Sequence, residues 1–326
     1  MRVGSLVRLT PLLFTTATQR VRAACTLSTQ SAYISAFRAR IQECNAQGPL
    51  SVPFFIGNDK VGEVRESLLP LLGEYPETFD VDEDSVRLAP ALITASLEER
   101  SRAVARVMEK VREAGFTRAW YDESLAIATS FDAPPALLLE RGCVPLFGAA
   151  GYGVFVNGYS THPDTGETWL WVATRSASKQ NWPGMLDVLV AGAQPAGLSP
   201  SENVVKEAQE EAGMSPELAQ SAVPVGCVSY KGTDEWGNAK RDVLFCYDLE
   251  VPWDFEPVAV DGEVESFTKM QLTEVANAVA HGKPALYKPN CNLVVIDFLV
   301  RRGFITPDSP GYLQMLAELR CSGDCR

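Results

Sequence analysis

The chain has 326 residues, 46% of them hydrophobic, which is enough for two domains of ordinary size with their own cores. Its 41 acidic residues outnumber its 29 basic ones, and the net charge of -12 disfavours binding to nucleic-acid phosphates. No apolar run reaches the ~18 residues of a membrane span, so neither nucleic acid nor a membrane is an expected partner.

The first 42 residues are basic and begin with a stretch rich in serine and threonine. They contain six arginines and no aspartate or glutamate, a composition typical of an organelle transit peptide. The run Val21-Arg22-Ala23-Ala24 further resembles a plastid processing site. We therefore predict a transit peptide over residues 1–24 and import into a plastid, or alternatively a mitochondrion. A basic disordered terminus unrelated to import is the other interpretation.

Residues 25–140 alternate between helical and strand patterns, and we interpret them as an α+β accessory domain. A long helix expected at 97–114 has Ser96 as its N-cap and Glu99 at the capping-box position. No residue here carries recognisable chemistry, so we expect a substrate-shaping or oligomerising domain, with a homodimer as one expected assembly. The expected elements are a helix at 31–44, an apolar segment at 52–56, a helix at 61–72, a helix at 97–114 and a strand or strand pair at 116–127.

The eight cysteines form no close-set framework, apart from Cys321 and Cys325 at the end of the sequence. With only His162 and His281 in the chain, we expect neither a zinc site nor a cysteine–histidine nucleophile. We interpret six or more cysteines as free and mostly buried. The terminal pair is interpreted as part of a frayed tail, with a redox disulfide as the alternative.

Residues 141–326 are interpreted as a second domain. A strand at 153–159 turns back through Pro163-Asp164-Thr165-Gly166, so a hairpin is expected, and a short buried strand at 188–190 leads into a glycine-rich loop. Mixed strands with flanking helices predict an α/β/α sandwich. The remaining expected elements are strands at 168–175, 223–230, 241–251 and 264–270 and helices at 273–281, 291–302 and 311–320.

The loop that begins at Gly192 runs into a helix with a clear start and end. Ser199 is a serine cap, Pro200 occupies the first helical position, and Glu202 completes a capping box. Gly213 is placed to end the helix in a left-handed conformation, which gives about 13 residues.

Three carboxylates project from one face of this helix. Glu207, Glu210 and Glu211 stand at i, i+3 and i+4, one turn apart, where they repel one another. A hard divalent cation, Mg²⁺ or Mn²⁺, would relieve that repulsion, since it prefers oxygen ligands and often holds substrate phosphates. A solvated acidic face is the alternative interpretation.

The stretch from Gly192 to Met214 resembles the Nudix box, and its spacing fits that pattern without an insertion. Lys206 stands where the pattern has arginine, Ala208 where it has a larger aliphatic residue, and Leu198 where it has the first glutamate. Leu198 is the serious departure, because the site then either loses a carboxylate or borrows Glu202. The matching residues are Gly192, Glu207, Glu210, Glu211, Gly213 and Met214.

The departure at Leu198 also occurs in the Nudix subfamily related to thiamine pyrophosphokinase, which this chain resembles over about residues 140–320. Within the box, the shared residues are Pro195, Gly197, Ser199, Glu202, Asn203, Lys206 and Ala212. Outside the box, the similar stretches are 146–148, 152–154, 156–159, 183–187, 247–250, 261–267 and 288–291.

The resemblance implies a Nudix fold with a mixed sheet, preceded by a smaller α+β domain, and a metal-dependent diphosphatase acting on a small-molecule diphosphate. Metal held by Glu207, Glu210 and Glu211 would neutralise the phosphates and activate water, and Lys206 would pair with a box carboxylate. The loop, with Gly192, Ala193 and Gly197, would approach the diphosphate through its backbone. The implied substrates are oxidised or damaged analogues of thiamine diphosphate.

The resemblance leaves the general base open, with Glu263, Glu265 and Glu202 as candidates. Trp182, Phe155 and Trp236 could stack on an aromatic substrate group, although such residues are more often part of the core. Two alternatives to the thiamine hypothesis remain. One is hydrolysis of 8-oxo-dGDP or a similar nucleotide, and the other is a Nudix-like module that binds diphosphates without cleaving them, which Leu198 favours.

Overall fold

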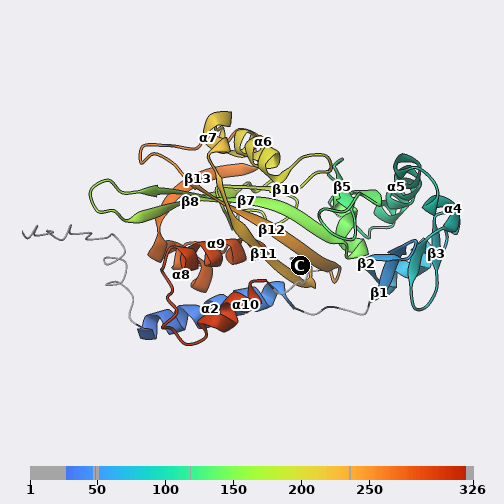
Figure 1. Ribbon diagram of the computed structural model, residues 1–326, viewed down its shortest axis with the longest axis horizontal. Helices are drawn as coiled ribbons and strands as arrows, with labels where there is room; N and C mark the ends of the chain where they lie inside the picture. Colours follow the sequence, from blue (N-terminus) through green and yellow to red (C-terminus); the bar gives the residue numbers. More distant parts are fainter. Residues whose placement is uncertain (1–26, 47, 49–50, 118, 235, 321–326) are drawn as a thin grey trace, which may run out of the picture.

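A mixed sheet of seven strands forms the centre of the C-terminal part of the chain (Figure 1). The computed structural model describes residues 27–46, 48, 51–117, 119–234 and 236–320. The predicted transit peptide, Cys25 and the pair Cys321 and Cys325 lie outside these residues. Among the described residues, no helix is long and apolar enough to cross a membrane.

Five strands of this sheet lie in the order β11, β12, β7, β8, β13, and β10 and β9 pair with β7 and β8. The β7–β12 pair is parallel, and its neighbours are antiparallel, so the sheet is mixed as predicted. The predicted hairpin between the two strands at 153–159 and 168–175 is confirmed. The bounds are β7 (Ala150–Thr161), β8 (Thr168–Arg175), β9 (Leu186–Asp187), β10 (Val190–Ala193), β11 (Val223–Thr233), β12 (Ala239–Glu250) and β13 (Val264–Gln271).

Helices cover both faces of the sheet, which confirms the α/β/α sandwich (Figure 1). One face packs against α8 (Leu272–His281) and α9 (Pro289–Arg301), which carry many of the fully buried residues. The other face packs against α6 (Pro200–Ala212) and the short α7 (Pro216–Gln220). The last described helix is α10 (Tyr312–Glu318).

A second hydrophobic core, made by residues 52–149, defines what we call the N-terminal unit. Its four-stranded sheet has the order β2, β1, β4, β3, and a separate hairpin joins β5 and β6. The predicted long helix is confirmed, with the Ser96–Glu99 capping box present. The bounds are β1 (Ser51–Ile56), β2 (Asp59–Arg65), β3 (Phe79–Val81), β4 (Val86–Leu88), β5 (Ser124–Ile127), β6 (Leu137–Glu140), α3 (Leu69–Leu72), α4 (Pro90–Ile93), α5 (Leu97–Glu113) and the 3₁₀ helices η1 (Glu66–Leu68) and η2 (Arg141–Phe147).

The helix expected at 61–72 is wrong over its first half. Gly57 takes a left-handed φ of 63°, and the turn that it forms brings β2 back along β1 as an antiparallel hairpin. Val61 and Val64 are thereby buried from the strand, and helical structure begins only at Glu66. The segment expected as strand from 116 to 127 is a strand only over β5.

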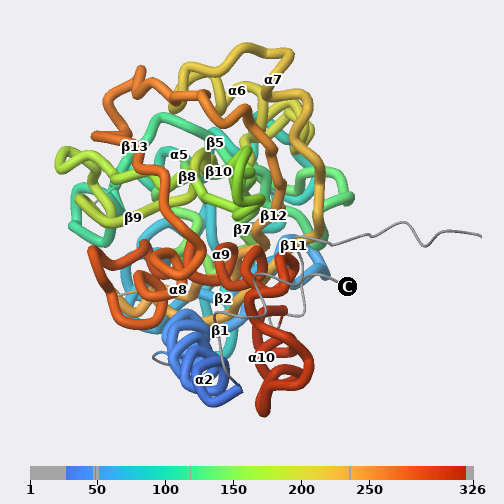
Figure 2. Tube along the Cα trace, turned by 90° about the vertical axis from the view of Figure 1, so that its left-hand side faces the viewer, coloured from blue at the N-terminus to red at the C-terminus, as the bar shows by residue number. Residues whose placement is uncertain are grey.

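The first described helix, α2 (Leu27–Cys44), packs against the C-terminal helices and not into the core of the N-terminal unit. Its buried residues Tyr33, Phe37 and Ile41 share a core with α8, α9 and α10. The Tyr33 hydroxyl also donates to Asn277 Oδ1 at 2.8 Å. Figure 2 shows α2 and α10 side by side beneath α8 and α9. The two ends of the described chain are therefore joined in one hydrophobic layer.

Five of the eight cysteines lie among the described residues, and all five are free thiols. Four of them, Cys44, Cys143, Cys246 and Cys291, are buried. Burial raises the pKa of Cys143 to about 12, so this thiol is protonated and unreactive at neutral pH. The prediction of free, mostly buried cysteines is confirmed for this part of the chain.

Phe37→Ala is expected to lower the free energy of unfolding by about 3–5 kcal/mol, since the ring is fully buried where α2 meets the C-terminal helices. Urea denaturation measures this change. Gln42→Ala, on the exposed side of the same helix, is the control and is expected to change stability by less than ~0.5 kcal/mol. Equal stability of both variants would contradict the packing of α2.

Candidate active site

The predicted helix start and end are both confirmed at α6. Ser199 Oγ accepts a hydrogen bond from the Glu202 backbone N–H, and the Glu202 carboxylate accepts one from the Ser199 N–H at 2.9 Å. Gly213 ends the helix with a φ of 61°. The hydrogen bonds from Ser199 lower the pKa of Glu202, whose carboxylate is thus occupied in the cap. Leu198 lies just before the cap and is 37% exposed.

The loop before α6 is held to the helix by a buried amide. Asn203 is fully buried and donates to the Ala193 carbonyl oxygen at 2.8 Å, while Gln194 donates to the Leu198 carbonyl oxygen at 2.6 Å. Gly192 lies directly against the Glu207 side chain, because a Cβ at this position would come within 2.2 Å of Glu207 Cδ. Only glycine therefore allows the loop and this carboxylate to lie so close together.

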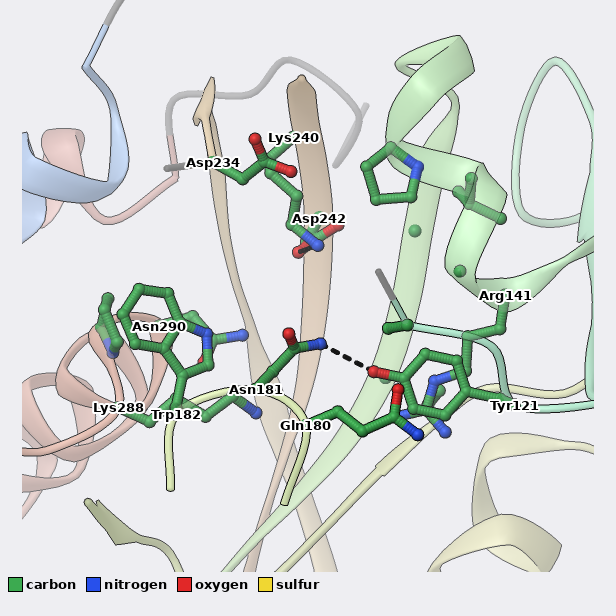
Figure 3. A pocket seen from close by; sticks show the side chains of 18 of the residues that line it. Tyr121, Arg141, Gln180, Asn181, Trp182, Asp234, Lys240, Asp242, Lys288 and Asn290 are labelled. Atoms are coloured by element: carbon green, nitrogen blue, oxygen red, sulfur yellow. Dashed lines mark hydrogen bonds and ion pairs between the residues drawn. The ribbon is translucent and has the colours of Figure 1, made fainter. Parts of the chain in front are cut away.

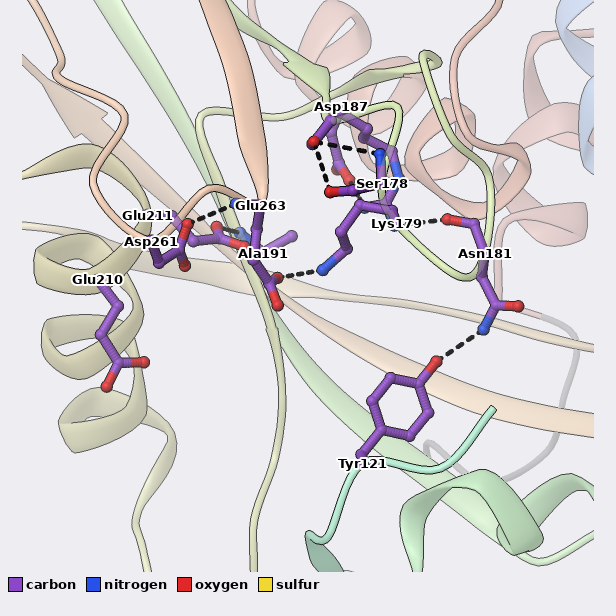
Figure 4. A network of polar contacts seen from close by, with 12 residues as sticks. Tyr121, Ser178, Lys179, Asn181, Asp187, Ala191, Glu210, Glu211, Asp261 and Glu263 are labelled. Carbon is purple, nitrogen blue, oxygen red and sulfur yellow. Dashed lines mark hydrogen bonds and ion pairs between the residues drawn. The ribbon is translucent and has the colours of Figure 1, made fainter. Parts of the chain in front are cut away.

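The three box carboxylates differ in their surroundings. Glu211 is buried and accepts a hydrogen bond from the Ala191 N–H at 2.9 Å, and the Glu207 side chain is only 13% exposed. Glu210 is half-exposed, and Figure 4 shows it on α6 apart from Glu211. Lys206 lies 3.2 Å from Glu207 and 2.7 Å from Glu210, so it pairs with two box carboxylates.

Negative charge is concentrated around the two buried carboxylates. Burial raises the pKa of Glu211 well above its usual range, and the charges of Asp187, Glu207 and Glu263 add to this despite the Ala191 hydrogen bond. Burial also raises the pKa of Glu207, against the opposing charge of Lys206. A divalent cation would offset this charge, and carboxylate oxygens are the ligands that Mg²⁺ and Mn²⁺ prefer. The donor set therefore fits a hard metal ion.

The three box carboxylates do not converge on a common metal position. Among the residues that the structure describes, no group of three or more His, Cys, Asp and Glu side chains has the spacing of a ready ligand set. Glu211 and Glu210 are instead turned toward the Ala191 N–H and Lys206. Side-chain rotation would be needed for all three box glutamates to hold the same ion.

Glu263, a candidate base, lies in an ion pair at the edge of the same site (Figure 4). Its carboxylate pairs with Lys179, and its backbone N–H donates to Asp261 Oδ1 at 2.8 Å. Burial would raise the pKa of Glu263, but Lys179 outweighs that effect and the pKa is lowered. Glu263 is therefore ionised at neutral pH. Glu265, the neighbouring candidate, is exposed and does not line the cavity described next.

A cavity of about 830 Å³ is lined both by the box loop and by residues of the N-terminal unit. Figure 3 shows part of this lining, including Tyr121 and Arg141. The cavity volume suits a small molecule of cofactor size. The three aromatic residues singled out in the sequence, Trp182, Phe155 and Trp236, all line it. Of the predicted site residues, Gly192, Ala193, Glu211 and Glu263 also line it, whereas Lys206, Glu207, Glu210 and Gly197 do not.

The cavity residues that lie in the N-terminal unit were not predicted from the sequence. Tyr121 and Arg141 line the cavity, and the Tyr121 hydroxyl accepts a hydrogen bond from Asn181 at 2.7 Å. No motif or spacing marks either residue, because they meet the box only through the fold. Asp187 was also missed as a charged group of the site, although it lies in a stretch that resembles the subfamily.

Asp187 holds the loop that carries Trp182. It is buried and accepts a hydrogen bond from Arg175 Nη1 at 2.7 Å, and the same guanidinium donates to the backbone oxygens of Asn181 and Trp182. Burial opposes ionisation of Asp187, but Lys288 and Arg175 keep its pKa below the usual value. The ion pair therefore fixes the loop on the cavity wall.

Comparison with known proteins gives the class of this chain. Residues 36–150 match a family model described as a domain of unknown function, DUF4743. Nudix hydrolase 24, chloroplastic, of Arabidopsis thaliana is 40% identical over 299 residues, covering 90% of this chain and 80% of the relative. Nudix hydrolase 20, chloroplastic, from the same plant is 41% identical over 305 residues, with the same coverage.

The chain belongs to the Nudix hydrolase family, and it is a hydrolase acting on diphosphate-linked compounds. Enzymes of this family generally use divalent metal ions. Among solved structures, the Nudix domain of Shewanella oneidensis NrtR complexed with ADP ribose is 14% identical, with a TM-score of 0.37. That match covers 48% of this chain and 90% of the other.

Gly192→Ala is expected to reduce turnover of a diphosphate substrate about 100-fold, because the added methyl group would displace Glu207. Turnover and the thermal midpoint are measured together. Gly73→Ala is the control, since its Cβ would meet only the Leu69 and Pro70 carbonyl oxygens, at 3.4 and 3.6 Å, and Gly73 does not line the cavity. Unchanged turnover of the Gly192 variant would show that the loop and Glu207 do not act together.

Proposed function

We propose that this Nudix hydrolase is a Mg²⁺- or Mn²⁺-dependent diphosphatase of the thiamine pyrophosphokinase-related subfamily. Its substrates are oxidised or otherwise damaged analogues of thiamine diphosphate, which it converts to the monophosphate and phosphate. The observation that carries the proposal is one cavity whose wall includes Gly192, Glu211 and the aromatic side chain of Trp182.

The cavity wall provides contacts for both halves of such a substrate. Trp182 offers a ring face for a heteroaromatic group, and base-like or thiazole-like rings stack well on such faces. Phe155 is only 4% exposed and belongs to the core, so it contributes less. Asp242 and Asn290, further along the wall, offer polar groups for ring substituents (Figure 3). The diphosphate would then lie toward Gly192 and Ala193, near the box carboxylates.

In this assignment Glu207, Glu210 and Glu211 hold the metal, which when bound supplies charge neutralisation and a more acidic water. Lys206 orients Glu207 and Glu210 through its two ion pairs. Glu263 is ionised and lies beside the cavity, where it can accept a proton from the attacking water. The protein otherwise contributes positioning of the diphosphate against the loop.

A plastid location is part of this proposal. Two relatives that are 40% and 41% identical carry the description chloroplastic, and the first residues of this chain have the composition of a transit peptide. An organelle that contains thiamine-dependent enzymes would benefit from removal of analogues that occupy their cofactor sites. Import of a fluorescent fusion of residues 1–60 into plastids would test the location separately from the chemistry.

Glu211→Gln and Glu210→Gln are each expected to reduce turnover on the order of 100-fold or more while the protein stays folded, because each removes a charged metal ligand. Turnover is measured with the Mg²⁺ and Mn²⁺ concentrations varied. Glu113→Gln is the matched control, since Glu113 is exposed and pairs with Lys110 at 2.8 Å. Wild-type turnover in both box variants would overturn the site assignment.

The substrate is tested by phosphate release from a panel of thiamine diphosphate, its oxo and oxy analogues, and 8-oxo-dGDP. We expect an oxidised thiamine diphosphate to have the highest kcat/KM. A higher value for 8-oxo-dGDP would keep the hydrolase class and discard the thiamine assignment. Binding of these compounds without any phosphate release would instead mean that Leu198 marks a module that binds diphosphates without cleaving them.

A further inference from the structure

The cavity wall near the box contains three cations whose charges act on Glu263, namely Lys179, Arg141 and Arg175. In two of them the N–H donors are already used by other groups. Lys179 pairs with Glu263 itself, and Arg175 donates through all of its nitrogens, to Asp187 and to two backbone oxygens. Neither the Lys179 nor the Arg175 side chain has all of its N–H donors free for an incoming anion.

Arg141 differs from these two cations. Among the described residues, its guanidinium donates only through Nη1, to Glu123 Oε2 at 2.9 Å. The group lies over the Tyr121 ring, 4.3 Å from the centroid, which holds its plane in one orientation. The side chain is 36% exposed and lines the cavity, so Nε and Nη2 remain open to a ligand there.

The backbone around Arg141 is fixed by the partly buried side chain of Glu140. The Glu140 carboxylate accepts hydrogen bonds from the Tyr121 N–H at 2.8 Å and from the Gly142 N–H at 3.1 Å. A Cβ at Gly142 would lie 1.9 Å from the Ala119 carbonyl oxygen, so the two segments are in close contact. Arg141 and Tyr121 are therefore presented together, as one rigid edge of the N-terminal unit.

This edge is tied to the loop that carries Trp182 by the hydrogen bond between Tyr121 and Asn181, drawn in Figures 3 and 4. The next residue on each side of that bond has a left-handed backbone, Asp122 at φ 54° and Trp182 at φ 55°. They are the two non-glycine residues with positive φ in the described part of the chain. Such strain persists only where surrounding contacts enforce it, and it gathers at ligand-binding sites.

We propose that Arg141 of the N-terminal unit binds the substrate's diphosphate in the Nudix active site, with Tyr121 and Asn181 positioning it. The DUF4743 segment thereby supplies a substrate-binding residue to the hydrolase. The proposal rests on the proposed function only in that the substrate is a diphosphate, whatever group the diphosphate carries.

The chemistry of the residue fits this role. A guanidinium offers a planar pair of donors that matches two phosphate oxygens, which a lysine cannot reproduce. A diphosphate brings a charge that the acidic box alone would repel, and the Arg141 cation in the same cavity offsets it. Glu123 keeps Arg141 paired when no ligand is present, so the site does not hold an isolated charge.

Binding of inorganic pyrophosphate with Mg²⁺, measured by calorimetry on the full chain, tests the role of Arg141. Arg141→Gln is expected to weaken binding about 10- to 100-fold, and Arg141→Lys is expected to recover part of the loss. Arg112→Gln is the matched control, because Arg112 lies over the Trp120 ring at 4.7 Å but does not line the cavity. Thermal midpoints of all variants are recorded alongside.

Wild-type affinity in Arg141→Gln, or equal losses in Arg141→Gln and Arg112→Gln, would overturn the proposal. Absence of pyrophosphate binding by the wild type would do the same, since the anion site would not exist. The thiamine assignment fails in a different way. If no thiamine analogue is hydrolysed and pyrophosphate binding still depends on Arg141, the substrate group is wrong and the role of Arg141 stands.

Discussion

The site depends on the burial of two carboxylates against the backbone of one loop. Glu207 lies against Gly192 so closely that no side chain fits between them, and Glu211 accepts a hydrogen bond from the Ala191 N–H. Taking carboxylates out of water is costly unless their charge is compensated. The loop glycine, the buried Asn203 and the cap at Ser199 all serve to hold this unfavourable arrangement, and a divalent cation is the kind of ligand that would compensate it.

The N-terminal unit carries no catalytic motif of its own. It instead forms one side of the cavity, since Tyr121, Arg141 and Phe116 line the same cavity as Gly192. A Nudix sheet alone would leave this side of the site open to water. Enclosure lowers the local dielectric and strengthens each charge interaction with a bound diphosphate. An accessory segment can thus shape specificity without supplying the groups that break the bond.

The features that depend on local sequence patterns were predicted correctly. They include the α6 cap at Ser199, the end of α6 at Gly213, the hairpin of β7 and β8, and the sandwich. Capping and hydrophobic periodicity act over a few residues, so a single sequence shows them. The β2 segment is compatible with a helix in sequence, since Val61 and Val64 are three residues apart, and only its pairing with β1 decides for a strand. Arg141 was not predicted as a site residue, because only the tertiary fold brings it into the same cavity as the box loop.

The packing of α2 has a consequence for how this protein reaches its folded state. Arg38 pairs with Glu318 at a separation of 280 residues, and Tyr33 bonds Asn277 at a separation of 244. Contacts so distant in sequence slow folding, because a long loop must close before they form. Until α8, α9 and α10 have folded, α2 keeps an apolar face exposed to water. Completion of this core is therefore a late event in folding, and chaperones have a long interval in which to bind the partly folded chain.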